Sequence, residues 1–304
     1  MSIDRGWRRG DACSLSETRR PGLIRNVGCG LSFNVTDDAV LAFQIAPATT
    51  AGELLAERLD VSVDGHAPAA PVVELRAELG GRTHVVRAGT GRLRIAYSAT
   101  IRAPERPPAP TSAPTIAAPD GVVFDADAIV ALRQSRYCPS DALTGFAAVE
   151  LGTIPPGPDR SRAIASWVFE RLAYELGASG PLDTAVDTLL ANAGACRDFA
   201  HVTISMCRAL GVPARIVAVY APGLSPMDFH AVVETRRGGC WEVLDPTRLA
   251  PRSSLVRIAT GRDAADTAFA TTLHGEAELL SSEIFASVDG DLPLDDHAAT
   301  VALP

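Results

Sequence analysis

The sequence predicts an α+β protein in which an N-terminal antiparallel β-sandwich precedes a domain of helices packed on an antiparallel sheet. Three observations support this fold class. Residues 31–101 alternate apolar and polar side chains with period two, as half-buried strands do. Residues 164–210 instead place apolar side chains at helical spacing, and residues 214–244 return to β-branched runs. Helices followed by consecutive strands are typical of an α+β domain.

The first 103 residues form the predicted sandwich domain. Leu41, Phe43 and Ile45 alternate on one face of a strand, and glycine-containing turns such as Asp64-Gly65 and Gly80-Gly81 separate the strands. Several short strands at this spacing indicate a β-sandwich. Residues 104–120 are rich in Pro and Ala and predict a semi-rigid linker.

Residues 121–290 form the predicted second domain. One helix covers residues 164–172, a second begins at an Asp183 cap, and a third runs from 195 to 210 and ends at Gly211-Val212-Pro213. Strands follow at 214–220, 230–236 and 240–244, with Gly238-Gly239 as a hairpin turn. Residues 276–304 hold seven acids and no arginine, so we expect the tail at 291–304 to be acidic and solvated.

Composition excludes several classes of protein. The chain has 304 residues with 47% apolar and 21% charged side chains, which excludes disorder throughout. A net charge of −8 argues against a nucleic-acid partner. Arg supplies every basic side chain, so no lysine is present for Schiff-base chemistry. No apolar run reaches the roughly 18–20 residues of a membrane helix, and the N-terminus does not resemble a signal peptide. We therefore expect a soluble, cytoplasmic protein with no membrane partner.

The six cysteines predict neither a disulfide framework nor a zinc site. The chain is long and lacks a Cys-x-x-Cys pair, so most of these thiols are expected to be buried and inert. We expect no metal and no cofactor. The cysteines are Cys13, Cys29, Cys138, Cys196, Cys207 and Cys240.

Cys196 is the exception, because it stands at the predicted start of the third helix. Free backbone N–H groups and the positive end of the helix dipole favour a thiolate there. The same N–H groups can receive the oxyanion that forms when a thiolate attacks an acyl carbon. Cys196 is therefore the candidate nucleophile.

His230 and Asp245 are the candidate partners of this thiol. With a two-residue turn at Gly238-Gly239, Arg237 pairs with Cys240, and His230 and Asp245 become diagonal neighbours on one face of the hairpin. A four-residue turn would place them opposite each other, whereas a three-residue turn would separate them unless a bulge intervened. In the favourable registers the carboxylate can bond one imidazole nitrogen and leave the other for Cys196.

Several motifs resemble those of bacterial transglutaminase-like proteins, which belong to the papain-like cysteine-enzyme superfamily. The resemblance covers roughly residues 135–275. Its strongest segments are Gly194-Ala195-Cys196-Arg197-Asp198-Phe199-Ala200-His201, Asp228-Phe229-His230-Ala231 and Trp241-Glu242-Val243-Leu244-Asp245-Pro246-Thr247. It implies Cys196 as nucleophile, His230 as general base and Asp245 as the residue that orients the base. Arg197 replaces the Trp of the animal enzymes, so calcium-dependent cross-linking is not implied.

These residues predict a cysteine-dependent acyl-transfer enzyme acting on a peptide or protein amide through a thioester, with hydrolysis as the first expectation. The alternatives are a transamidase or amide synthase that uses an amine acceptor, and a non-catalytic module that binds a peptide or partner protein.

Three further side chains have weaker signals. Trp241 is a candidate substrate-binding residue that could wall the acyl site, although a core aromatic is the simpler interpretation. Arg197 could meet a substrate carboxylate, but a structural ion pair is favoured. His201 lies five residues after Cys196 and turns away from it on a helix, so a structural histidine is expected.

Overall fold

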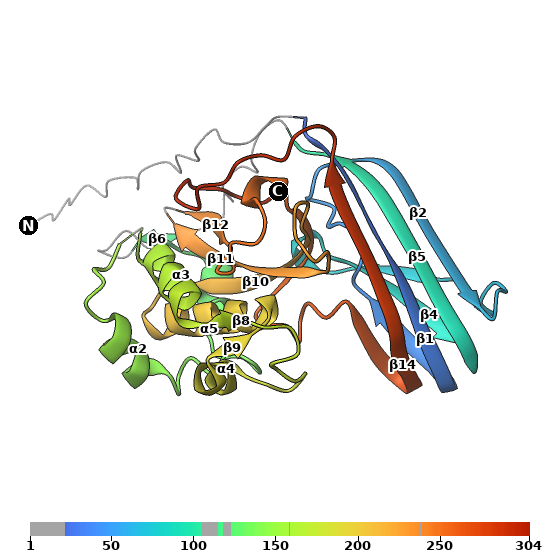
Figure 1. Cartoon of the computed structure of the whole chain (residues 1–304), viewed down its shortest axis with the longest axis horizontal. Coiled ribbons are helices and arrows are strands. Elements are labelled where there is room, and N and C mark those ends of the chain that lie inside the picture. The colour runs from blue at the N-terminus through green and yellow to red at the C-terminus, as the bar shows by residue number, and fades with distance from the viewer. Residues whose placement is uncertain (1–21, 105–114, 118–122, 158, 238) are drawn as a thin grey trace, which may run out of the picture.

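The computed structural model describes residues 22–104, 115–117, 123–157, 159–237 and 239–304. Figure 1 shows two parts, one of long strands and the other of helices around a smaller sheet. Most of the predicted linker at 104–120 lies outside the described residues, as does Cys13. No helix of the described segments is long and apolar enough to span a membrane.

The long strands form one antiparallel sheet of order β2-β5-β1-β4-β3, with β14 on the other edge of β1. The 20-residue strand β1 pairs with β5 over Ile24–Val35 and with β4 over Ala39–Phe43. Because β1 continues through both regions, the strands join in one curled sheet, and the predicted sandwich of two separate sheets is not confirmed. The strands are β1 (Ile24–Phe43), β2 (Glu53–Val63), β3 (Val73–Arg76), β4 (Arg82–Ala88), β5 (Gly91–Arg102) and β14 (Ala270–Val288).

Strand β14 corrects the predicted domain boundaries. Residues 270–288 were expected in the second domain, but they pair with β1 from Phe43↔Ala270 to Arg25↔Val288. The long sheet is therefore built from both ends of the chain. Sequence alternation marks a strand but does not name its partner, which here lies more than 220 residues away.

The helical part surrounds a four-stranded antiparallel sheet of order β12-β11-β10-β13. Helix α5 packs against this sheet through buried side chains that include Phe199, Val202 and Met206. The predicted helix at 195–210 and the three predicted strands are confirmed. The elements are α1 (Ala126–Val130), α2 (Thr144–Leu151), α3 (Arg160–Arg171), α4 (Ala185–Ala191), α5 (Cys196–Ala209), β10 (Ala214–Tyr220), β11 (His230–Arg237), β12 (Cys240–Leu244) and β13 (Val256–Gly261). Two short pairs, β6 (Ile116–Ala117) with β7 (Val123–Phe124) and β8 (Ala173–Tyr174) with β9 (Ala193–Gly194), complete them.

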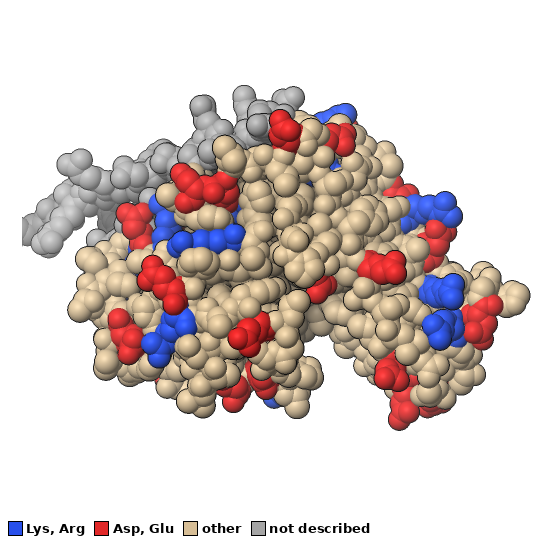
Figure 2. All heavy atoms as spheres, in the orientation of Figure 1, with Lys and Arg blue, Asp and Glu red and all other residues tan. Residues whose placement is uncertain are grey.

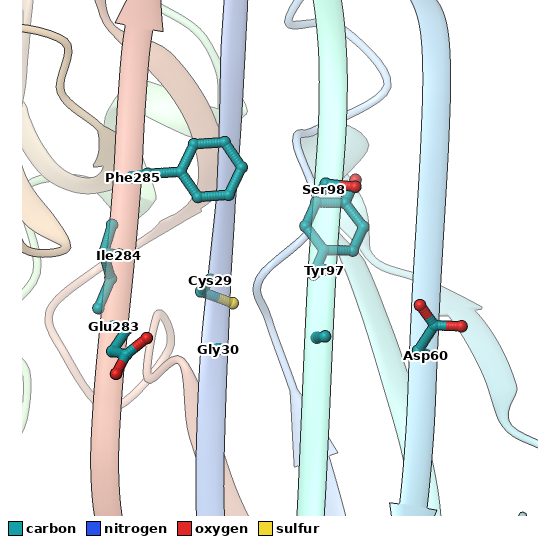
Figure 3. Close-up of a pocket in the computed structure, with 9 residues that line it drawn as sticks. Cys29, Gly30, Asp60, Tyr97, Ser98, Glu283, Ile284 and Phe285 are labelled. Carbon is teal, nitrogen blue, oxygen red and sulfur yellow. The ribbon is translucent and has the colours of Figure 1, made fainter.

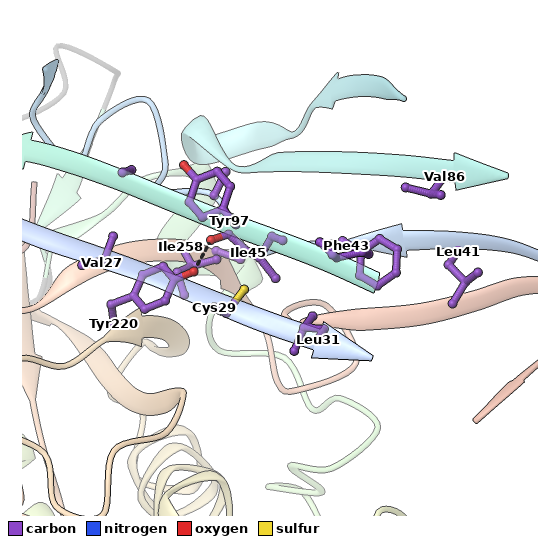
Figure 4. Close-up of a cluster of buried hydrophobic side chains, with 14 of the residues drawn as sticks. Val27, Cys29, Leu31, Leu41, Phe43, Ile45, Val86, Tyr97, Tyr220 and Ile258 are labelled. Carbon is purple, nitrogen blue, oxygen red and sulfur yellow. Dashed lines mark hydrogen bonds between the residues drawn. The ribbon is translucent and has the colours of Figure 1, made fainter. Parts of the chain in front are cut away.

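A shared apolar core joins the two parts. Tyr220 and Ile258 of the smaller sheet pack against Val27 and Cys29 of the long sheet (Figure 4). The Tyr220 hydroxyl donates a 2.7 Å hydrogen bond to the carbonyl of Ile45, so the one polar group that tyrosine brings into this core is satisfied.

The acidic tail is docked rather than solvated, which corrects the expectation for residues 291–304. Val301 and Leu303 are buried, and the carbonyl of Val301 accepts a hydrogen bond from the amide of Val243 on β12. Asp295 pairs with the buried Arg252 at 2.8 Å. The carboxylate of Asp295 is therefore paired with a guanidinium that lies 43 residues earlier in the chain.

The N-terminus of α4 differs slightly from the prediction. Thr184, not Asp183, is the N-cap, and Asp187 completes a capping box with it. Asp183 instead accepts a hydrogen bond from the amide of Gly180. Cys240 is disulfide-bonded, which the sequence analysis does not anticipate. The free thiols among the described residues are Cys29, Cys138, Cys196 and Cys207.

Candidate active site

Cys196 is the first residue of α5, and its side chain is partly exposed. The residue before it, Ala195, cannot cap the helix with its side chain. The fully buried Asp198 compensates, because its carboxylate accepts a 2.9 Å hydrogen bond from the amide of Ala195. A Cβ at Gly194 would lie 2.6 Å from that of Asp198, so the close approach requires glycine. The thiol is thus fixed at a helix N-terminus, where backbone N–H groups lack intrahelical partners.

Arg197 is a structural residue, as the sequence analysis favours. Its guanidinium donates to the carbonyl of Gly180 at 2.7 Å and pairs with Asp198 at 2.8 Å. Ser179 donates a short hydrogen bond to the same Asp198 carboxylate. These contacts attach the loop around residue 180 to the first turn of α5, so the positive charge of Arg197 is already matched.

His230 and Asp245 lie side by side at one end of the hairpin of β11 and β12. Arg237 pairs with Cys240, which confirms the predicted two-residue turn and register. Nε2 of His230 lies 3.0 Å from Oδ2 of Asp245, and both side chains are fully buried. Thr247 donates to the other carboxylate oxygen through its amide at 2.9 Å and its hydroxyl at 2.7 Å. The carboxylate is therefore held in place on both oxygens.

The pair with Asp245 favours the protonated form of the imidazole. Burial lowers the pKa of His230, but the charge and hydrogen bond of Asp245, together with the contact to Cys196, outweigh it and raise that pKa to about 10. Nδ1 of His230 is buried and has no hydrogen-bond partner within the described residues. It is therefore the nitrogen left for the thiol.

The thiol reaches the beginning of β11. Sγ of Cys196 lies 4.0 Å from the carbonyl oxygen of Phe229, the residue before His230. The interaction between the imidazole and the thiol contributes to the raised pKa of His230. The structure thus brings together Cys196, His230 and Asp245, the three residues that the sequence analysis selects.

Tyr174 is a residue of this site that sequence reasoning missed. Strand β8 pairs with β9 in parallel, so Tyr174 lies opposite Gly194, two residues before Cys196. Its ring packs 5.9 Å from that of Phe199. Partial burial and the nearby charges of Cys196 and Asp228 raise the pKa of its phenol to about 12, so the hydroxyl stays a neutral donor. A two-residue strand leaves no periodic pattern, so the sequence offered no signal for it.

Trp241, the candidate substrate-binding residue, is not brought next to Cys196, His230 and Asp245. It pairs with Arg236 next to the hairpin turn, four residues and about 13 Å of strand from Asp245. Its ring is instead covered by the guanidinium of Arg215, 3.8 Å from the ring centre. His201 is structural, as expected: it accepts a hydrogen bond from the amide of Ala264 and stacks on Tyr137.

A cavity of about 430 Å³ lies away from these residues, on the long sheet (Figure 3). The residues that line it include Gly30, Ala96, Asp60, Glu283 and Phe285. None of the three candidate catalytic side chains lines this cavity. It therefore does not identify the place where an acyl substrate would meet Cys196.

Comparisons with known proteins agree with this geometry. The family model of the transglutaminase-like superfamily matches residues 147–246, a range that contains Cys196, His230 and Asp245. The matched residues, about a third of this chain, are similar to transglutaminase-like domains. A solved structure from Cytophaga hutchinsonii, whose name proposes it as a cysteine protease, superimposes with a TM-score of 0.79 at 29% identity. That similarity covers 93% of this chain and 97% of the other, so it includes the long sheet as well as the transglutaminase-like domain.

A curated relative, the uncharacterized protein ML0607 of Mycobacterium leprae, is 31% identical over 119 residues. The match covers 35% of this chain and 41% of that protein's length.

Proposed function

We propose that this protein is a cysteine-dependent acyl-transfer enzyme that hydrolyses amide bonds of peptides or proteins. One observation carries the proposal: a thiol at a helix N-terminus lies beside an imidazole whose far nitrogen is 3.0 Å from a buried carboxylate. The name of the Cytophaga hutchinsonii relative, which proposes a cysteine protease, supports the same chemistry. The transglutaminase-like domain supports a cysteine-dependent enzyme in general, and the choice of hydrolysis is ours.

The proposed reaction begins from the Cys196 thiolate and the His230 imidazolium. The sulfur attacks the carbonyl carbon of the amide, a C–S bond forms, and the carbonyl π electrons move to the oxygen. Collapse of this oxyanion breaks the C–N bond as Nδ1 of His230 donates its proton to the leaving amine. The product is a thioester on Cys196 and a neutral imidazole.

Water completes the cycle. Nδ1 of His230 accepts a proton from a water molecule whose oxygen attacks the thioester carbon, and the C–S bond then breaks. The acyl group leaves as a carboxylic acid, and the thiolate and imidazolium are restored. Asp245 holds the ring through Nε2 and stabilises its positive charge, but takes no proton itself.

Two donors can stabilise the oxyanion in this scheme. The first is the free backbone N–H at the start of α5. The second is the hydroxyl of Tyr174, which β8 holds opposite Gly194. Because the pKa of this phenol is about 12, the hydroxyl donates a hydrogen bond rather than carrying a charge of its own.

Alkylation by iodoacetamide near pH 7, followed by peptide mass spectrometry, tests the proposal on the folded chain. We expect Cys196 to be labelled first and His230→Ala to slow that labelling. Cys138 and Cys207 serve as internal controls, because burial raises the pKa of both thiols to about 12. Labelling of Cys196 no faster than of these two would reject a reactive nucleophile and favour a non-catalytic binding module.

A second measurement separates hydrolysis from transfer to an amine. Peptide amides are incubated with the protein in water alone and with added ethylamine, and the products are identified by mass. A free carboxylate in both mixtures supports hydrolysis. An N-ethyl amide as the main product would instead identify a transamidase. Cys196→Ala should abolish either product, and a product that survives this substitution would reject the proposed nucleophile.

A further inference from the structure

Asp228 is a charged residue at the entrance to the site that the proposed reaction does not use. It is exposed, stands two residues before His230, and accepts a 2.7 Å hydrogen bond from the amide of Phe229. The ring of Phe229 stacks on that of Phe269 with centres 5.1 Å apart. Since Phe269 immediately precedes β14, Asp228 lies where the transglutaminase-like domain meets the long sheet.

The surroundings of the Tyr174 hydroxyl show how the charges at this entrance are arranged. The carbonyl oxygen of Phe229, the residue after Asp228, lies 4.0 Å from Sγ of Cys196, so Asp228 is near the thiol. The carboxylates of Asp228, Asp245 and Asp198 all act on the Tyr174 hydroxyl. Two of these carboxylates already have cationic partners: Asp245 pairs with His230, and Asp198 with Arg197. The structure gives Asp228 no ion pair of this kind within the described residues, and its side chain is exposed.

The surface view (Figure 2) shows the hollow between the two parts of the molecule. Along the crevice between the helical part and the long sheet, the coloured side chains on the face drawn in Figure 2 are mostly acidic. Nδ1 of His230 is buried, has no hydrogen-bond partner among the described residues and is the ring nitrogen left for the thiol. The exposed carboxylate of Asp228 thus lies two residues from the catalytic imidazole.

We propose that Asp228 selects substrates that carry a positive charge next to the acyl group attacked by Cys196. This inference rests on the proposed function, because it names the substrate class of the same site. The exposed carboxylate of Asp228 would pair with an ammonium or guanidinium group of the substrate. An acidic group in the same position would be repelled.

Methanethiosulfonate reagents of different charge test this proposal without a known substrate. The thiolate attacks the reagent sulfur, a disulfide forms and methanesulfinate leaves. The rate constant for labelling of Cys196 is measured with the trimethylammonium-ethyl and the sulfonato-ethyl reagent. Each value is divided by the rate constant of the same reagent with 2-mercaptoethanol, which corrects for the intrinsic reactivity of the reagent. We expect the cationic reagent to be favoured about 3- to 10-fold, as one partly solvated charge a few ångströms away would give.

Matched variants assign the preference to one carboxylate. Asp228→Asn should lower the cation-to-anion ratio toward one, and Asp228→Glu should retain it. Asp37→Asn removes an equal charge from an exposed position on the long sheet and should leave the ratio unchanged. Cys196→Ala measures labelling of other thiols. A wild-type ratio of one, or a ratio that survives Asp228→Asn in folded protein, would overturn the proposal.

Peptide coumarin amides that end in Lys, Ala or Glu distinguish failure of this inference from failure of the proposed function. Cleavage of all three at equal rates would keep the hydrolase and reject the charge preference. Cleavage of none, with the reagent preference intact and lost in Asp228→Asn, would keep the charge preference and reject hydrolysis of these amides. The expected result is fastest cleavage after Lys and slowest after Glu.

Discussion

Nε2 of His230 and Oδ2 of Asp245 are 3.0 Å apart and fully enclosed, although 15 residues separate them in the chain. The hairpin turn produces this contact. Two turn residues between Arg237 and Cys240 set a register in which the first residue of β11 and the residue after β12 become diagonal neighbours. Adding one residue to the turn would move one of the two side chains to the opposite face of the sheet.

The first prediction concerns the charge of His230. Burial opposes protonation, and Asp245 is the strongest of the groups that favour it, so Asp245→Asn should lower the pKa of His230 well below about 10. The neutral imidazole would no longer stabilise the thiolate, and alkylation of Cys196 near pH 7 should slow about tenfold or more. The alkylation rate measured as a function of pH checks this expectation.

The same pair makes stability depend on pH. A group whose pKa is higher in the folded than in the unfolded state stabilises fully below the unfolded value, about 6.5, and loses this contribution as pH rises through about 10. Urea unfolding near pH 7 and near pH 10 should therefore show a larger loss for the wild type than for Asp245→Asn. Equal losses in the two proteins would argue that the imidazole is not charged in the folded state.

The second prediction concerns Tyr174. Tyr174→Phe keeps the ring against Phe199 but removes the hydroxyl. If this group stabilises the oxyanion, kcat for amide hydrolysis should fall about 10²-fold while KM changes little. Alkylation by iodoacetamide forms no oxyanion, so its rate should stay within about threefold. Tyr137→Phe is the matched control, because the ring of Tyr137 stacks on that of His201 instead. A parallel fall in alkylation would indicate a disturbed thiol rather than a lost donor.

How much of the site could be predicted differs from residue to residue. Cys196, His230 and Asp245 were accessible because a helix start and a tight turn are local features with known geometry. Tyr174 was not, since its place depends on the two-residue pairing of β8 with β9. The surroundings of Trp241 are not predictable either, because Arg215 comes from another strand and nothing in the hairpin itself identifies that cation–π contact.

The fold shows the same limit. Alternation in residues 31–101 correctly indicated strands, but their assembly into one curled sheet depends on β1 running without a break through the exposed segment Thr36–Asp38. The docking of the acidic tail depends on Arg252, a cation buried 43 residues earlier. Local patterns establish elements, whereas long-range pairs decide where those elements lie.

The third prediction concerns a buried ion cluster in the smaller sheet. Glu234 is fully buried between Arg215 and Arg257, with contacts of 2.7 and 2.5 Å. Burial would raise its pKa, but the two guanidinium groups outweigh this and lower it to about 2. Glu234→Gln leaves two buried cations without their anion, so unfolding free energy should fall by about 3–5 kcal/mol.

Urea denaturation near pH 7 measures this loss. Glu278→Gln, on the exposed surface of β14, should change stability by less than about 0.5 kcal/mol. Since the folded pKa of Glu234 is depressed, its contribution is present above about pH 4.5 and disappears as pH falls through about 2. A loss in Glu234→Gln no larger than in the surface control would show that the cluster does not stabilise the fold.

The last prediction concerns the tail that follows β14. Burial opposes ionisation of Asp295, yet bonds from the side chain and amide of Arg252 hold its pKa well below the ordinary range. Asp295→Asn should therefore release the tail by local unfolding, because the guanidinium of Arg252 loses its anion. The amide of Val243, which donates to the carbonyl of Val301, should then exchange its hydrogen faster.

Asp296→Asn is the control for this prediction, because it removes an exposed charge one residue away and should leave that exchange rate unchanged. In the wild type the contribution of Asp295 should begin to decline only as pH falls below about 4, and it should be lost fully only as pH approaches the depressed pKa of Asp295. If Val243 remained protected in Asp295→Asn, the burial of Val301 and Leu303 would be sufficient to hold the tail without this ion pair.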